Sequence, residues 1–152
     1  LNDYVMKNDR VQSFELGDKK GILLTAKHEN SIAYNQSISY VATLNEPCTV
    51  IFLVDAVSRK YFTSETSWIW DINFEKINSD NIKKVIIGGK YIHDLVARFT
   101  YSQIDMSKVI AEENIEKIVE IAKTESVGTI YLITCFADRM KFLSHTKQLK
   151  KE

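Results

Sequence analysis

The sequence predicts a single α/β domain built on a mostly parallel sheet with helices on both faces. Short apolar runs rich in β-branched residues are typical of strands that are buried on both faces. These runs alternate with amphipathic stretches of helical period, which is the pattern of parallel strands joined by helices. Two β-rich runs near the N-terminus predict an antiparallel hairpin that adds an edge strand to the sheet.

The expected elements follow one another along the whole chain. The hairpin comprises runs 11–16 and 21–27, joined by 17–20, and buried strands are expected at 48–55, 83–88, 106–111 and 129–134. Asn30 is a plausible cap for the first helix. Segment 147–151 is expected to be a frayed, solvated end. The four helices are predicted from apolar stripes at helical spacing, formed by Tyr34, Ile38 and Val41; by Ile92, Leu95, Val96 and Phe99; by Ile115, Ile118, Val119 and Ala122; and by Phe136, Met140 and Leu143.

Composition limits the classes of function that the chain can have. Its 152 residues predict one domain, 1–152, with 1–7 as a hinge or tail. Basic and acidic residues number 20 each, so no charge excess indicates nucleic acid as a partner. No apolar run approaches the roughly 18 residues of a membrane span, and the N-terminus lacks the layout of a signal peptide. We therefore expect a cytoplasmic protein, and a start at Leu1 is compatible with a fragment of a longer chain.

Cysteine and histidine usage argues against a metal site. Cys48 and Cys135 form no Cys-x-x-Cys motif, and no cluster supplies about four ligands. Both are expected to be reduced core thiols. A second possibility is that Cys135 acts as a nucleophile with one of the three histidines as its base, which would require the pair to lie within hydrogen-bond reach.

Polar residues at the carboxyl ends of the expected strands are the candidates for a site. Those ends are 27–30, Asp55 with its connector, Gly88-Gly89 and Thr134-Cys135. Asp55 either reaches such a site or serves as a turn carboxylate. Neither Gly-x-x-x-x-Gly-Lys-[Ser/Thr] nor Gly-x-Gly-x-x-Gly occurs, so no loop of this chain is expected to grip phosphates.

Both tryptophans lie within segment 64–75, close to Glu65, Asp71 and Glu75. Two alternatives stay open for this segment. It is either a connector packed on the core, because buried tryptophan is mostly structural, or the builder of a binding edge.

Segment 66–75 reads Thr-Ser-Trp-Ile-Trp-Asp-Ile-Asn-Phe-Glu and resembles the Asp-Val-Ser-Trp-Ile-Trp-Asp-Val-Asp-Phe-Glu signature of the MurT family. Segment 29–36 is similar to the family's Lys-Asn-Pro-Ala-Gly-Phe-Asn-Gln, and Arg10 begins a stretch similar to its Phe-Gly-Arg-Val-Glu. Further matches, in the family's order between 8 and 146, are Gly89, Asp94, Arg98, Tyr101, Thr134 and Ala137.

The resemblance implies a C-terminal, Rossmann-like domain of the Mur ligase type. MurT proteins are the ligase subunit of lipid II isoglutaminyl synthase and use ATP with Mg²⁺ to amidate the D-glutamate of a lipid-linked peptidoglycan precursor. Ammonia comes from a glutaminase partner, GatD. The central domain with the P-loop lies outside this chain, which is therefore expected to be non-catalytic alone and to bind no metal.

Roles for individual residues follow from the same resemblance. Arg10, Asn30 and Asn35 would lie on the nucleotide side. Asp55 and Glu65 are the candidates to complete the catalytic triad of a partner glutaminase. The signature and structural positions are Trp68, Trp70, Asp71, Gly89, Asp94 and Arg98.

Departures from the family's pattern leave a second function open. Glu29, Ser31 and Ala33 replace the family's Lys, Pro and Gly, and Tyr91 replaces an Arg. A Glu in place of a Lys beside a phosphate reverses the sign of the interaction. The alternative is a stand-alone or degenerate protein-interaction module that retains the fold without ligase chemistry.

Overall fold

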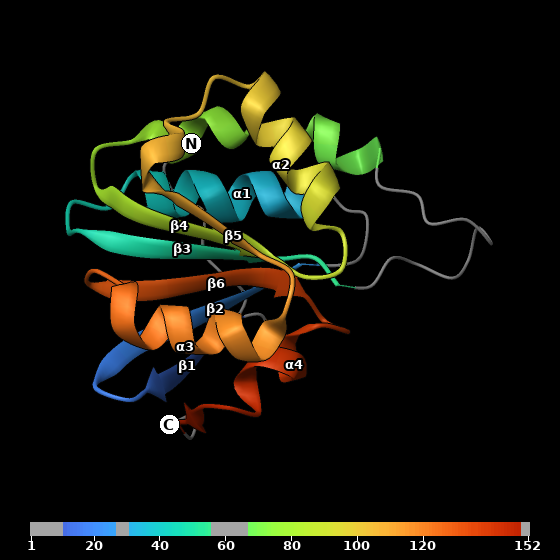
Figure 1. Cartoon of the computed structure of the whole chain (residues 1–152). Coiled ribbons are helices and arrows are strands. Elements are labelled where there is room, and N and C mark those ends of the chain that lie inside the picture. The colour runs from blue at the N-terminus through green and yellow to red at the C-terminus, as the bar shows by residue number, and fades with distance from the viewer. Residues whose placement is uncertain (1–10, 27–30, 56–66, 150–152) are drawn as a thin grey trace.

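The computed structural model describes residues 11–26, 31–55 and 67–149 (Figure 1). Within these ranges seven strands form one sheet in the order β5-β4-β3-β6-β2-β1-β7. Strands β2, β6, β3, β4 and β5 run parallel, whereas β1 is antiparallel to both of its neighbours. The strands are β1 (Val11–Leu16), β2 (Lys19–Ala26), β3 (Cys48–Leu53), β4 (Ile82–Gly88), β5 (Val109–Glu112), β6 (Thr129–Cys135) and β7 (Lys147–Gln148). The predicted α/β class and the N-terminal hairpin are confirmed, but the edge strand beside the hairpin is β7 and not β1.

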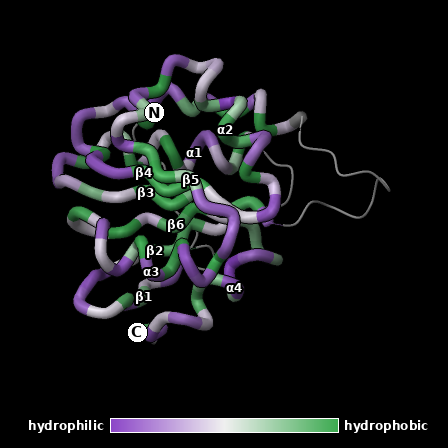
Figure 2. The backbone as a smooth tube through the Cα atoms, in the orientation of Figure 1, coloured by the Kyte–Doolittle hydropathy of each residue, from purple (hydrophilic) through white to green (hydrophobic). Residues whose placement is uncertain are grey.

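Helices cover both faces of this sheet, as Figure 1 shows. The helices of the described ranges are α1 (Ser31–Ala42), α2 (Ile92–Tyr101), α3 (Ile115–Glu125) and α4 (Arg139–Leu143), with 3₁₀ helices η3 (Ser67–Asp71), η4 (Phe74–Asn78) and η5 (Met106–Lys108). Apolar residues of α1, α2, η3 and η4 share one core with the sheet, and those of α3 and α4 share another. Figure 2 shows the apolar strands between more polar helices.

Alternation along β3 connects the two cores. All six residues of β3 are buried. Val50 and Phe52 belong to the core beneath α1, and Ile51 and Leu53 to the core beneath α3. Because successive side chains of a strand point to opposite faces, a continuous apolar run is what a doubly covered strand requires.

Three local predictions were wrong. The predicted strand at 106–111 begins with η5, because the Asp105 carboxylate accepts the Ser107 N–H and starts a turn. Lys147 and Gln148 are not a frayed end, since they pair with β1 as β7. Phe136 and Met140 do not face the core with Leu143. They are 63% and 45% exposed, because α4 has only five residues and buries Phe142 and Leu143.

The helices that follow β3 and β6 in the chain lie on opposite faces of the sheet. The segment after β3 continues into η3 and η4 on one face, whereas β6 continues into α4 on the other. In open α/β sheets, ligands bind outside the carboxyl ends of the strands at such a switch point. The residues that follow β3 and β6 are therefore the first place to look for a site.

Candidate functional site

The side chains that follow β3 and β6 meet in one polar cluster, formed by Asp55, Asp138 and Lys141. The ammonium of Lys141 lies 2.6 Å from Asp55 Oδ2 and 2.9 Å from Asp138 Oδ1. The backbone N–H of Asp55 donates to Asp138 Oδ2 at 2.9 Å, and the N–H of Lys90 donates to Asp55 Oδ1 at 2.8 Å. One lysine thus bridges two carboxylates across the switch point.

Burial differs sharply among these three residues. The Asp138 side chain is 0% exposed, whereas those of Asp55 and Lys141 are 23% and 39% exposed. Burial lowers the pKa of Lys141, but hydrogen bonds to Asp55 and Asp138 outweigh it and the net shift is upward. The lysine therefore stays charged throughout the neutral range.

Cys135 belongs to the inner side of this cluster. Its Sγ lies 3.2 Å from Asp138 Oδ2, and burial followed by the charge of Asp138 raises the thiol pKa to about 12. A nucleophilic cysteine needs the opposite shift, since the thiolate is the reactive form. His93 and His145 are exposed, and His28 lies outside the described residues. Both Cys48 and Cys135 are buried and free, as predicted for core thiols.

Tyr34 connects this cluster to the segment that holds both tryptophans, residues 67–75, called the tryptophan segment from here on. Its ring lies 5.1 Å from that of Trp68. Burial first, and then the proximity of Cys135 and Asp138, raise the pKa of its hydroxyl well above the ordinary value. The Trp68 Nε1 is buried and has no hydrogen-bond partner among the described residues.

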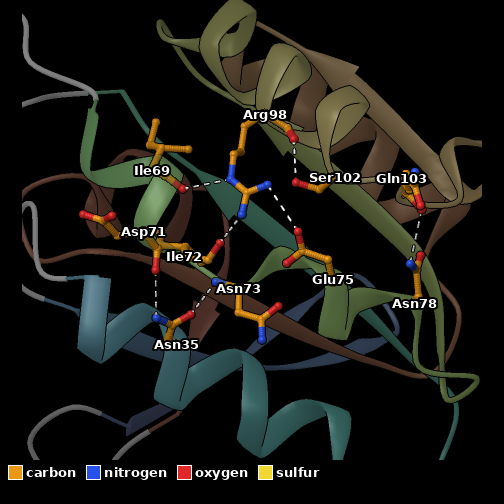
Figure 3. Close-up of polar contacts among 10 residues, drawn as sticks. All are labelled: Asn35, Ile69, Asp71, Ile72, Asn73, Glu75, Asn78, Arg98, Ser102 and Gln103. Carbon is orange, nitrogen blue, oxygen red and sulfur yellow. Dashed lines mark hydrogen bonds and ion pairs between the residues drawn. The ribbon is translucent and has the colours of Figure 1, made fainter.

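Arg98 fastens the tryptophan segment to α2 (Figure 3). Its Nε donates to the Ile69 carbonyl, one terminal nitrogen donates to the Ile72 carbonyl, and the other lies 3.4 Å from Glu75 Oε1. The guanidinium also stacks near the rings of Trp70 and Phe74, at 5.5 Å from each centroid. Arg98 itself is 6% exposed. The family position predicted to be structural is thus a buried clamp.

Asn35 on α1 fastens the same segment from the other side (Figure 3). Its Nδ2 donates to the Asp71 carbonyl at 3.2 Å, and its Oδ1 accepts the N–H of Asn73 at 2.6 Å. Trp68 is 8% exposed and packs in the core, whereas Trp70 is 47% exposed and lies against Tyr101. The segment therefore combines a packed connector with an exposed aromatic edge.

The sequence that forms this site matches a known family. Residues 28–138 fit the family model described as MurT ligase C-terminal. The chain belongs to the MurT ligase C-terminal family. The resemblance predicted from segment 66–75 is confirmed.

Curated MurT proteins extend the match over most of the chain. This chain is 24% identical over 133 residues to the MurT subunit of the glutamine-hydrolysing lipid II isoglutaminyl synthase from Streptococcus pneumoniae. That match covers 88% of this chain and 29% of the Streptococcus protein. Against the MurT subunit of Staphylococcus aureus it is 30% identical over 115 residues, covering 75% of this chain and 25% of that protein. The chain thus spans less than a third of the length of these relatives.

A solved ligase supports the fold. The structure of MurF from Acinetobacter baumannii superposes with a TM-score of 0.59 at 9% identity, covering 91% of this chain and 29% of MurF. At that identity the likeness establishes the architecture alone, which is that of a Mur ligase C-terminal domain. None of the helices in the described part of the chain has both the length and the apolar character that crossing a bilayer requires.

Beside Asp55 this MurT domain has an open groove of about 690 Å³. Four carboxylates and two ammonium groups line it, from Asp55, Glu112, Glu113 and Glu116 and from Lys90 and Lys117. This balance favours cationic or hydrogen-bond-donating groups over phosphates. Within the described ranges, no group of three or more His, Cys, Asp or Glu side chains is placed to hold a metal ion.

The remaining predicted residues occupy different parts of the MurT domain. Gly89 forms the β4–α2 turn with a φ of 103°, and a Cβ there would lie 2.4 Å from the Val54 carbonyl. Asp94 lies exposed in the first turn of α2. Asp71 is exposed and meets Asn35 through its backbone carbonyl. Arg10, Asn30 and Glu65 lie outside the described residues.

Sequence reasoning missed Asp138 and Lys141. A signal was present, since Asp138 comes three residues after the end of β6 and that end was already among the expected site positions. The sequence did not indicate that Asp138 and Lys141 contact Asp55, because they lie 83 and 86 residues further along the chain.

Proposed function

We propose that this chain is the C-terminal domain of a MurT-like ligase subunit that amidates the D-glutamate of lipid II, a lipid-linked peptidoglycan precursor. Ammonia would come from a GatD-like glutaminase that docks on this domain. The observation that carries the proposal is the partly exposed, firmly held Asp55 carboxylate at the switch point of a MurT-family fold. The chain would work in the cytoplasm and would not be catalytic alone.

Asp55 is the carboxylate that we assign to the glutaminase. In a Cys–His–carboxylate arrangement, the carboxylate orients the imidazole and stabilises its charged form. Asp55 suits this role because its oxygens are held from two sides while the side chain keeps 23% of its surface exposed. Glu65, the other sequence candidate, lies outside the described residues and serves as the comparison for Asp55 in substitution experiments.

ATP and Mg²⁺ would be held mainly by a central ligase domain. The groove beside Asp55 does not fit a triphosphate, because carboxylates outnumber ammonium groups along it. Asn35, a nucleotide-side candidate, uses both ends of its amide on the tryptophan segment. The contribution of this chain to the nucleotide therefore rests on Arg10 and Asn30.

The test uses the full-length protein co-expressed with the glutaminase of its own organism. The expected result is glutamine- and ATP-dependent amidation of lipid II, followed by mass spectrometry of the stem peptide. Asp55→Asn should lower amidation driven by glutamine on the order of 100-fold but retain amidation driven by added ammonium, because only the supply of ammonia fails. Glu65→Gln is the matched comparison. Loss of both activities in Asp55→Asn, or of neither, would contradict the assignment.

The acidic groove favours a second candidate function, a protein-interaction module without ligase chemistry. Such a module would retain the docking surface for a glutaminase and have no use for ATP. Two measurements on the same co-expressed protein separate the candidates, namely co-purification of the glutaminase and ATP hydrolysis in the presence of lipid II. Co-purification without hydrolysis would favour the module, and hydrolysis that depends on lipid II would favour the ligase.

A further inference from the structure

We propose that Lys141 and Asp138 are positioning residues, which hold the Asp55 carboxylate in the orientation that a docked glutaminase uses. This inference rests on the proposed role of Asp55. It assigns a function to two residues of α4 and its cap that the family signature does not include.

Three contacts restrain Asp55. The N–H of Lys90 meets Oδ1 from the β4–α2 turn, and the ammonium of Lys141 meets Oδ2 from α4. These contacts approach from different elements, so together they restrict rotation of the carboxylate. The backbone of Asp55 is fixed as well, because its N–H donates to the Asp138 carboxylate.

Asp138 makes the arrangement rigid. Its side chain is fully buried, and each of its oxygens is engaged: Oδ1 by Lys141, and Oδ2 by the Asp55 N–H and the Cys135 thiol. A buried carboxylate is tolerated only when it is paired and hydrogen-bonded. Asp138 therefore places Lys141 and the Asp55 backbone relative to one another, at the boundary between β3 and β6.

Asp55 keeps the capacity to accept further donors. An ionised carboxylate offers about four lone-pair sites, and the described contacts occupy one on each oxygen. Two carboxylates share a single ammonium, so the trio carries excess negative charge. An imidazole N–H of a partner is the kind of group that such an exposed, oriented acceptor recognises.

A purely structural role for Lys141 predicts a different behaviour. Lys141 also neutralises Asp138, whose carboxylate is fully buried, and removing one partner of a buried carboxylate destabilises a fold. If that were the only role of Lys141, its replacement would lower Tm, and the loss of activity would follow the loss of folded protein. A positioning role predicts a lower kcat in the protein that stays folded, since small displacements of an orienting group slow a reaction strongly.

The experiment measures glutamine hydrolysis by the full-length protein in complex with its glutaminase, as glutamate released. Asp55→Asn should lower kcat on the order of 100-fold. Lys141→Met, assayed well below its own Tm, should lower kcat about 10-fold with little change in KM for glutamine, and Lys141→Arg should restore most of the loss. Lys123→Met removes an exposed α3 lysine from its pair with Glu120 and should leave kcat unchanged.

The outcomes separate the two proposals. Full activity in Asp55→Asn would overturn both the role of Asp55 and the positioning role. Loss in Asp55→Asn with wild-type kcat in Lys141→Met would overturn the positioning role alone. A fall in kcat for Lys141→Met that follows a fall in Tm, without rescue by Lys141→Arg, would show a structural lysine and overturn the inference as well.

Discussion

At the residue scale, the guanidinium of Arg98 makes contacts that a narrower cation does not reproduce. It reaches the Ile69 and Ile72 carbonyls at the same time while lying near two aromatic rings. A planar fork with several donors is needed for this, and a lysine ammonium is a point charge. The signature segment is therefore held by one side chain from α2, located 26 and 29 residues further along the chain.

Arg98→Lys should lower the free energy of unfolding by about 2–3 kcal/mol, because a buried carbonyl loses its charged donor. Urea unfolding followed by tryptophan fluorescence measures the loss. Lys123→Met, at an exposed lysine of α3, is the matched control and should change stability by about 0.5 kcal/mol or less. Equal effects of the two substitutions would contradict the clamp.

The Cys135 thiol predicts a pH dependence of folding. Burial, and then the charge of Asp138, raise its pKa from 9.0 to about 12. The unfolded chain therefore loses this proton first as the pH rises. The contribution of the neutral thiol to stability is complete below pH 9.0 and is lost as the pH rises toward about 12.

Cys135→Ala removes this contribution. The difference in unfolding free energy between wild type and Cys135→Ala should be smaller at about pH 10.5 than at about pH 7.5. Urea titrations of both proteins at the two pH values measure it. A difference that does not depend on pH would show that the thiol titrates alike in the folded and unfolded chains.

At the scale of elements, the turn between β4 and α2 depends on close backbone approach. Gly89 adopts a φ of 103°, and its N–H donates to the Glu112 carbonyl while its Cα faces Val54. This turn also presents the Lys90 N–H to Asp55, so its shape determines one of the contacts at the candidate site.

Gly89→Ala should destabilise the fold by about 2–4 kcal/mol, because the new Cβ meets backbone atoms and the φ is strained. Gly17→Ala is the matched control. It also has a positive φ, of 61°, but nothing lies within 4 Å of its added Cβ. That substitution should cost only about 1 kcal/mol. Thermal unfolding of the two variants compares them directly, and similar losses would contradict the role of close approach.

At the scale of the whole molecule, the C-terminal residues close the antiparallel edge of the sheet. Phe14 and Glu15 of β1 pair with Gln148 and Lys147 of β7, and the Leu149 N–H donates to the Ser13 carbonyl. Without β7, the outer side of β1 would present free backbone groups. Exposed strand edges of this kind promote pairing between chains.

Truncation after Thr146 should lower stability by about 1–2 kcal/mol and promote concentration-dependent self-association. Sedimentation velocity over a range of concentrations measures the association, and urea unfolding measures the stability. Gln148→Ala in the full chain is the control, because it removes the Gln12–Gln148 side-chain bond while keeping the backbone pairing. A truncated chain that stays monomeric would contradict the edge-covering role.

Local pattern alone was sufficient to predict most of the fold. The sequence predicted the strands β3, β4 and β6 from their β-branched runs, and the helices α2 and α3 from their apolar stripes. Burial on one or both faces leaves such a pattern in a few adjacent residues. Segment 66–75 likewise indicates the family through the order of its residues alone, without any tertiary information. The exceptions were short elements, α4, η5 and β7, in which one or two tertiary contacts outweigh the local pattern.

Sequence by itself therefore determined the class of fold and the family, and it made Asp55 a candidate site residue because Asp55 follows a buried strand. Only the tertiary structure decided which side chains Asp55 meets. Lys90, Asp138 and Lys141 lie 35, 83 and 86 residues further along the chain, and they converge because parallel strands align their carboxyl ends at one edge. Strand order in the sheet sets that convergence, and no local pattern of residues encodes strand order.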